Sequence, residues 1–204
     1  MKIAVGSDHC GYKMKMQVLP YLEKNHEIID YGCYSTDMVD FPDIAQQICG
    51  AILSGKAERG IMFCSTGCGA VIACNKIKGI RAALCHDTYC AHQCVEHDNV
   101  QILALGGEVI GYYTAIEVIN SFLGAEFSGE AEFVRRLEKL EHLSCFLLSH
   151  PDFPDSVACQ AGIQDPLGHI LRGLPVGGID PLLCSAEADL ELRPGRAGAH
   201  HTSL

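Results

Sequence analysis

Five short apolar runs, each followed by a segment with helical periodicity, constrain the fold of this 204-residue chain more than any other feature. A strand and a helix that alternate in this way predict parallel strands, because each helix carries the chain back to the edge where the previous strand began. The expected strands are residues 2–7, 27–32, 60–63, 81–85 and 101–107, and the expected helices are 12–22, 42–53, 70–77, 88–96 and 111–122. The sequence therefore predicts a doubly wound α/β fold, a Rossmann-like three-layer sandwich with a five-stranded parallel sheet.

The chain changes character after residue 144. Residues 130–142 predict a charged amphipathic helix with Phe133, Leu137 and Leu140 as its apolar stripe. Six of the eight prolines then fall between residues 151 and 194, where neither helical nor strand periodicity persists. We expect a domain at 1–144 and an extension of uncertain order at 145–204.

The composition limits the classes of partner. A formal net charge of −10 argues against nucleic acid or an anionic membrane as the main partner, since such binding depends on clustered Lys and Arg. No apolar run approaches the roughly 18 residues that a membrane span needs. The N-terminus enters a strand without the regions of a signal peptide, so we expect a soluble cytoplasmic protein.

Twelve cysteines are many for this length. Cys49, Cys74 and Cys85 lie within apolar helix or strand patterns, which favours reduced, buried thiols over disulfides. Zinc binding is an alternative, with ligands from Cys64, Cys68 and Cys74 or from Cys90, Cys94 and His86. None of these residues forms a Cys-x2-Cys pair, so buried thiols are the preferred interpretation.

The segment Cys64-Ser65-Thr66-Gly67-Cys68-Gly69 joins the third strand to the third helix. The backbone N–H groups of a helix N-terminus gather there and favour an anion, or a group that becomes anionic during a reaction. This helix N-terminus is also expected to lower the pKa of the Cys64 thiol. The segment thus combines a possible base with possible oxyanion donors.

Other polar residues are expected near this loop. In doubly wound folds a ligand lies beyond the carboxyl ends of the strands. Asp8 and His9 follow the first strand, His86 follows the fourth, and further residues follow Gly106 after the fifth. All of them are predicted at the same edge of the sheet as Cys64.

Several separate blocks at matching spacing carry a resemblance to a known family. They are Gly6-Ser7-Asp8-His9-Cys10-Gly11, Val39-Asp40-Phe41-Pro42-Asp43, the loop 64–69, residues 73–82 and Glu96-His97-Asp98-Asn99. Over residues 1–143 the chain resembles the type B ribose-5-phosphate isomerase and galactose-6-phosphate isomerase family. The resemblance implies aldose–ketose isomerisation of a phosphorylated sugar through an enediolate, without a metal or other cofactor, in a homodimer or dimer of dimers with shared active sites.

The resemblance also implies roles for individual residues. Cys64 matches the thiol that removes the proton beside the carbonyl, and Thr66 matches a hydroxyl near the substrate oxygens. His97 matches the group that assists ring opening, contributed by the neighbouring subunit. The implied substrate-binding residues are Asp8, His9, Ser65, Gly67, Cys68, Gly69, Asn99 and Arg136, with the N–H groups of 67–69 as the oxyanion hole. One branch of the family uses a Glu where this chain has Ala70, which assigns the chain to the thiol branch.

Two positions differ from many family members. Glu108 and Glu132 stand where an Arg is common, while Arg136 matches. A carboxylate repels a phosphate dianion, by about 1 kcal/mol at 4 Å in water. Ribose 5-phosphate is the first expected substrate, with another pentose or hexose phosphate, a galactose-6-phosphate-like sugar or an unphosphorylated sugar as alternatives. A partner-dependent, non-catalytic subunit is the rival interpretation.

Overall fold

The computed structural model describes residues 1–149, with side chains as far as residue 143. Its elements in chain order are β1 (Lys2–Ser7), α1 (Tyr12–Leu22), β2 (Glu27–Asp30), α2 (Phe41–Leu53), β3 (Arg59–Cys64), α3 (Cys68–Asn75), β4 (Ala82–Leu84), α4 (Thr88–Glu96), β5 (Ile102–Gly106), α5 (Tyr112–Gly124) and α6 (Ala131–Ser149). The five predicted strand–helix alternations are confirmed. The third helix ends at Asn75, slightly earlier than predicted.

All five strands are parallel, in the spatial order β2-β1-β3-β5-β4. The last strand in sequence therefore lies between β3 and β4. Cys64 at the end of β3 is in register with Gly106 at the end of β5. Residues that follow β5 are thus brought beside the loop that follows β3.

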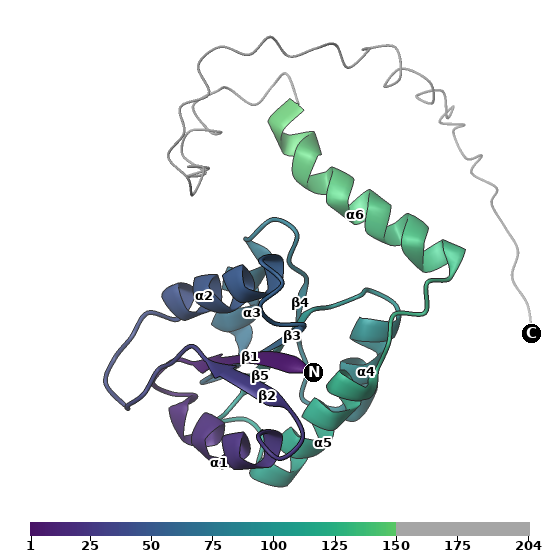
Figure 1. Ribbon diagram of the computed structural model, residues 1–204. Helices are drawn as coiled ribbons and strands as arrows, with labels where there is room; N and C mark the ends of the chain where they lie inside the picture. Colours follow the sequence, from purple (N-terminus) through teal and green to yellow (C-terminus); the bar gives the residue numbers. More distant parts are fainter. Residues whose placement is uncertain (150–204) are drawn as a thin grey trace, which may run out of the picture. The chain divides into compact units, whose positions relative to one another are not determined.

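Helices cover both faces of the sheet (Figure 1), as a doubly wound fold requires. Helices α1, α4 and α5 pack on one face, in a core that includes Phe63 and Phe122. Helices α2 and α3 pack on the other face, in a core that includes Ile48 and Met62. Alternate residues of β3 point into opposite cores, because successive side chains of a strand point to opposite faces.

The helix predicted at 130–142 is present as α6 and continues to Ser149. The predicted domain boundary after residue 144 falls within this helix, and the extension from residue 150 onward lies outside the described residues, so the division into domain and extension stays a prediction. Phe133 is buried, whereas Leu140 is exposed. Among residues 1–149, none of the helices combines the length and the apolar character needed to cross a membrane.

Candidate active site

Cys64 ends β3 at the carboxyl edge of the sheet, and only 7% of its surface is exposed. The chain then turns into α3 at Gly67, whose φ of +81° lies in the left-handed region. A side chain would be strained by this φ, and its Cβ would also lie only 3.1 Å from the Leu105 carbonyl carbon, so glycine suits this turn. This turn places the helix N-terminus directly after the thiol.

The Asp8 carboxylate is buried beside Cys64. Its Oδ1 accepts a hydrogen bond of 2.8 Å from the Gly11 N–H, and the Asp8 N–H donates to the Phe63 carbonyl at 3.1 Å. A Cβ on Gly11 would lie 2.3 Å from the Phe63 carbonyl carbon. Only glycine therefore allows the loop after β1 to approach the end of β3 so closely.

The expectation of a lowered pKa for Cys64 was wrong. Burial raises the pKa of this thiol, and so do its hydrogen bond to Asp8 and the negative charge of that carboxylate. The backbone N–H groups of Gly67 and Ser65 act in the opposite direction, as expected at a helix N-terminus, but their effect is smaller. Burial and the Asp8 carboxylate therefore favour the thiol over the thiolate.

Replacing Asp8 by asparagine is expected to lower the pKa of Cys64. The substitution removes the negative charge that disfavours the thiolate and keeps a side chain of similar size. The midpoint of the pH profile for alkylation of Cys64 by iodoacetamide, followed by peptide mass spectrometry, should move to lower pH. Asp43→Asn, on the exposed start of α2, removes the same charge as a control. Equal midpoints in wild type and Asp8→Asn would contradict this electrostatic coupling.

Hydrogen bonds and close packing hold the other residues of the loop 64–69. Thr66 Oγ1 accepts a hydrogen bond of 3.3 Å from the Cys68 N–H, and Ser65 Oγ donates to Glu108 Oε2 at 2.5 Å. The Glu108 N–H also donates to the Ser65 carbonyl at 3.0 Å. Cys68 is exposed, and a Cβ on Gly69 would lie 3.0 Å from the Phe41 ring. The carboxylate of Glu108 therefore lies on the loop itself, a contact that the sequence did not reveal.

Two histidines follow strands at the same edge. His9 Nδ1 accepts a hydrogen bond of 3.4 Å from the Val39 N–H, which in the neutral ring leaves the proton on Nε2. His86 Nε2 accepts a hydrogen bond of 3.0 Å from the Gly106 N–H. This contact ties the end of β4 to the end of β5, and it supports a structural role for His86.

His97, Asn99 and Arg136 form a second group, which does not include the Cys64 loop. The His97 ring stacks on Phe133 with 4.1 Å between ring centroids, and the Arg136 guanidinium lies 5.3 Å from the centroid of the same Phe133 ring. Arg136 also pairs with Glu132 at 3.6 Å, so part of the charge of each is offset by the other. Asn99 has a φ of +48°, in the left-handed region. We call His97, Asn99 and Arg136 the histidine group.

The histidine group and Cys64 lie at opposite edges of the sheet. Asn99 precedes the amino end of β5, whereas Cys64 is in register with Gly106 at its carboxyl end. At roughly 3.3 Å per residue, the length of β5 from Ile102 to Gly106 alone is about 13 Å. A single chain therefore does not bring Cys64 and His97 into one site.

The two alternative zinc sets are not assembled among the residues that the structure describes. No group of three or more His, Cys, Asp or Glu side chains in this part of the chain could hold a metal ion. The described cysteines are free thiols, and Cys49, Cys74 and Cys85 are buried, as predicted.

Comparison with known proteins gives consistent matches. The family model described as Ribose/Galactose Isomerase matches residues 3–140. Ribose-5-phosphate isomerase B of Escherichia coli is 38% identical over 129 residues, which are 63% of this chain and 87% of that protein. D-erythrulose-4-phosphate isomerase of Pectobacterium atrosepticum is 40% identical over 146 residues, which are 70% of this chain and 96% of that protein. The solved structure of Clostridium thermocellum ribose-5-phosphate isomerase B is 40% identical, with a TM-score of 0.69 over 71% of this chain and 98% of that one.

Proposed function

This chain belongs to the ribose/galactose isomerase family, and on that premise we propose that it interconverts ribose 5-phosphate and ribulose 5-phosphate with Cys64 as the base. The observation that carries the proposal is the environment of the Cys64 sulfur. The thiol is buried, the nearby Asp8 carboxylate raises its pKa, and the backbone N–H groups of Gly67 and Ser65 act to lower it. Such an arrangement can move a proton and stabilise the oxyanion that forms as the proton leaves.

The reaction needs no oxidant. Asp8, the acceptor of the thiol hydrogen bond, takes the thiol proton, and the thiolate removes the proton from C2 of the open-chain aldose. The electron pair of the C2–H bond forms the C1–C2 double bond, and the carbonyl electrons move to O1 to give an enediolate. Cys64 then returns the proton to C1, while the O2 hydroxyl proton passes to O1 with Thr66 as the nearby hydroxyl. Asp8 gives its proton back to the Cys64 thiolate, which restores the starting site. The products contain the same atoms as the substrate.

We further propose that a second copy of the chain supplies the histidine group. The separation of His97 from Cys64 supports this, because the group that assists ring opening must reach the same sugar. Helix α6 also presents the apolar side chains Val134, Leu140 and Leu143 to solvent. Exposed apolar side chains on one helix favour association with another surface. A homodimer or dimer of dimers would satisfy both requirements.

The identity of the sugar depends on the charged groups beside the Cys64 loop. Glu108 accepts a hydrogen bond from Ser65 at the Cys64 loop, so a carboxylate is held where it would repel a nearby phosphate. This contact favours, as a second candidate, a sugar whose phosphate binds farther from the loop, or an unphosphorylated sugar. The relative from Pectobacterium is named for a four-carbon sugar phosphate, which makes chain length the first variable to test.

A panel of aldose phosphates with four, five and six carbons, assayed beside the free sugars, tests the function. We expect ribose 5-phosphate to give the highest kcat/KM for ketose formation. If a different sugar gives the highest kcat/KM, that sugar replaces ribose 5-phosphate as the proposed substrate. If no sugar is isomerised by the purified protein, and activity appears only when a second family member is added, the non-catalytic subunit is the correct interpretation.

Mixed dimers test the shared site. Co-expressed Cys64→Ala and His97→Ala chains carry different affinity tags, so that the mixed dimer can be purified by two successive steps. If His97 acts in the partner's site, one of its two sites contains both substitutions and the other contains neither. We expect about half of the wild-type activity in the mixed dimer, although each parent dimer is inactive or nearly so. Mixed dimers no more active than the parents would contradict the shared site.

A further inference from the structure

Arg81 lies just before β4, at the same edge of the sheet as the histidine group. Its Nε donates hydrogen bonds to the Asp98 carbonyl at 2.9 Å and to the Asn99 carbonyl at 3.1 Å. Its Nη2 donates to the same Asn99 carbonyl at 3.1 Å. The guanidinium thus holds the backbone that directly follows His97.

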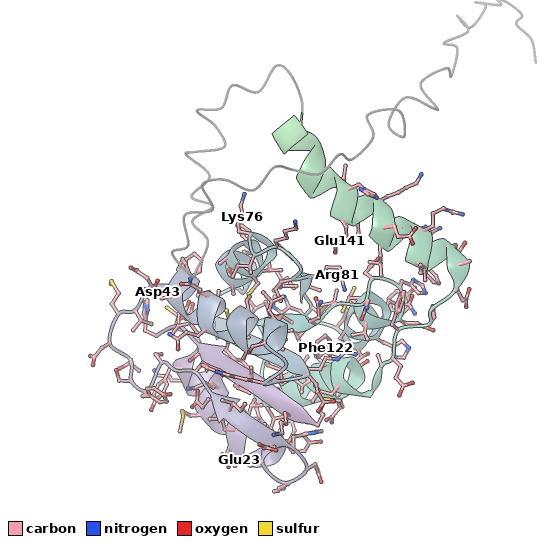
Figure 2. All side chains as sticks on the ribbon, turned by 45° about the horizontal axis from the view of Figure 1, so that its top comes forward. Glu23, Asp43, Lys76, Arg81, Phe122 and Glu141 are labelled. Carbon is pink, nitrogen blue, oxygen red and sulfur yellow. The ribbon has the colours of Figure 1, made fainter. Side chains whose placement is uncertain are left out.

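The other end of the guanidinium contacts α6. Arg81 Nη1 lies 3.0 Å from Glu141 Oε1, and the two residues are adjacent where α6 passes the body of the domain (Figure 2). The Arg81 backbone is fixed as well, because its N–H donates to Gln101 Oε1 at 2.8 Å and its carbonyl accepts from the Gln101 N–H at 3.0 Å. Arg81 therefore connects β4, the loop before β5 and α6.

These connections determine where His97 and Arg136 lie. His97 belongs to the loop, Arg136 belongs to α6, and both rest on the Phe133 ring. Asn99 adopts a left-handed conformation, which asparagine tolerates better than most other non-glycine residues. The two hydrogen bonds from Arg81 to its carbonyl help to hold the backbone in this conformation.

We propose that Arg81 is a positioning residue for the histidine group, and that it acts in the active site of the partner subunit. The inference rests on the proposed function and on the shared site. A planar guanidinium can reach two carbonyls and a carboxylate at the same time, whereas a lysine ammonium lacks this fork. An exposed ion pair to Glu141 alone would have little effect, so the contacts to the carbonyls distinguish this role from that of an ordinary surface charge.

Arg81→Ala and Arg81→Lys test the role in steady-state kinetics with ribose 5-phosphate. A displacement of the histidine group should lower kcat and raise KM, for a combined loss of about 10- to 100-fold in kcat/KM, and lysine should not rescue it. A merely destabilised protein would instead contain fewer active molecules, with kcat reduced and KM unchanged. Lys76→Ala, at the exposed end of α3, removes the same charge from a side chain with no hydrogen bond or ion pair among the described residues, and should leave both constants unchanged.

Mixed dimers identify the site on which Arg81 acts. Cys64→Ala paired with Arg81→Ala should regain about half of the wild-type activity, because one site is then intact. If the mixed dimer has no more than the activity of one Arg81→Ala site, or if Arg81→Lys has wild-type kcat and KM, the role of Arg81 is refuted. Failure of the Cys64→Ala and His97→Ala mixture would instead refute the shared site, and an inactive wild type would refute the proposed function itself.

Discussion

Replacing Cys64 by alanine is expected to reduce kcat for sugar-phosphate isomerisation by about 10²- to 10⁴-fold, the usual contribution of a general acid or base. The thiol is the group that both removes and returns the carbon-bound proton in the proposed reaction. Neither the Asp8 carboxylate nor the Thr66 hydroxyl occupies its position at the end of β3. The measurement is the initial rate of ketose formation with the best substrate of the panel.

Cys90→Ala is the matched control for this experiment. Cys90 is an exposed thiol on α4, outside the Cys64 loop, so its loss should change kcat by less than about threefold. Circular dichroism and the melting temperature should be close to wild type in both variants, because each substitution removes a single sulfur. Near-wild-type activity in Cys64→Ala would exclude Cys64 as the base.

Replacing Lys15 by alanine is expected to destabilise the domain by about 3 kcal/mol, near the lower end of the range for a broken buried ion pair. The Lys15 side chain is completely buried, and its Nζ lies 2.8 Å and 2.9 Å from the two Asp30 oxygens and 2.7 Å from the Cys33 carbonyl. Its removal leaves these acceptors without their shared donor. Because Asp30 retains some contact with solvent, the effect stays below the maximum. A fall of roughly 6–12 °C in melting temperature is the corresponding observation.

Lys13→Ala provides the comparison on the same helix. Lys13 is exposed, so this variant removes the same charge from α1 without breaking a buried contact. Its free energy of unfolding in urea should be within about 0.5 kcal/mol of wild type. If Lys15→Ala were equally mild, the buried pair would contribute little to stability and the loop of Asp30 and Cys33 would be held by other contacts.

The Lys15 pair shows what could have been read from the sequence. Lys15 lies three and four residues before Val18 and Leu19, on the stripe of α1 that faces the core. A charged residue at that position must have a buried partner, and this could have been inferred. The identity of the partner could not, because Asp30 becomes adjacent only when β1 and β2 pair.

The acidity of Cys64 illustrates the opposite case. The helix N-terminus after it was predicted correctly, and its N–H groups do lower the pKa of the thiol. The direction of the overall shift is nevertheless reversed by burial and by Asp8. Burial depends on every element packed around the end of β3, and Asp8 approaches only because Gly11 lacks a side chain. Neither the burial of Cys64 nor the approach of Asp8 can be inferred from the loop sequence.

The sequence alone determined the alternation of strands and helices and the placement of Asp8, His9 and the Cys64 loop at one edge of a parallel sheet. Hydrophobic periodicity and turn residues act over a few neighbouring positions, so a local pattern is sufficient for these features. Only the tertiary structure decided that β5 lies next to β3, which brings Glu108 to Ser65. It also decided that His97 lies at the opposite edge of the sheet from Cys64, where Arg81 donates hydrogen bonds to the backbone that follows His97. Strand order and contacts between distant segments depend on packing of the whole chain, for which no local pattern is sufficient.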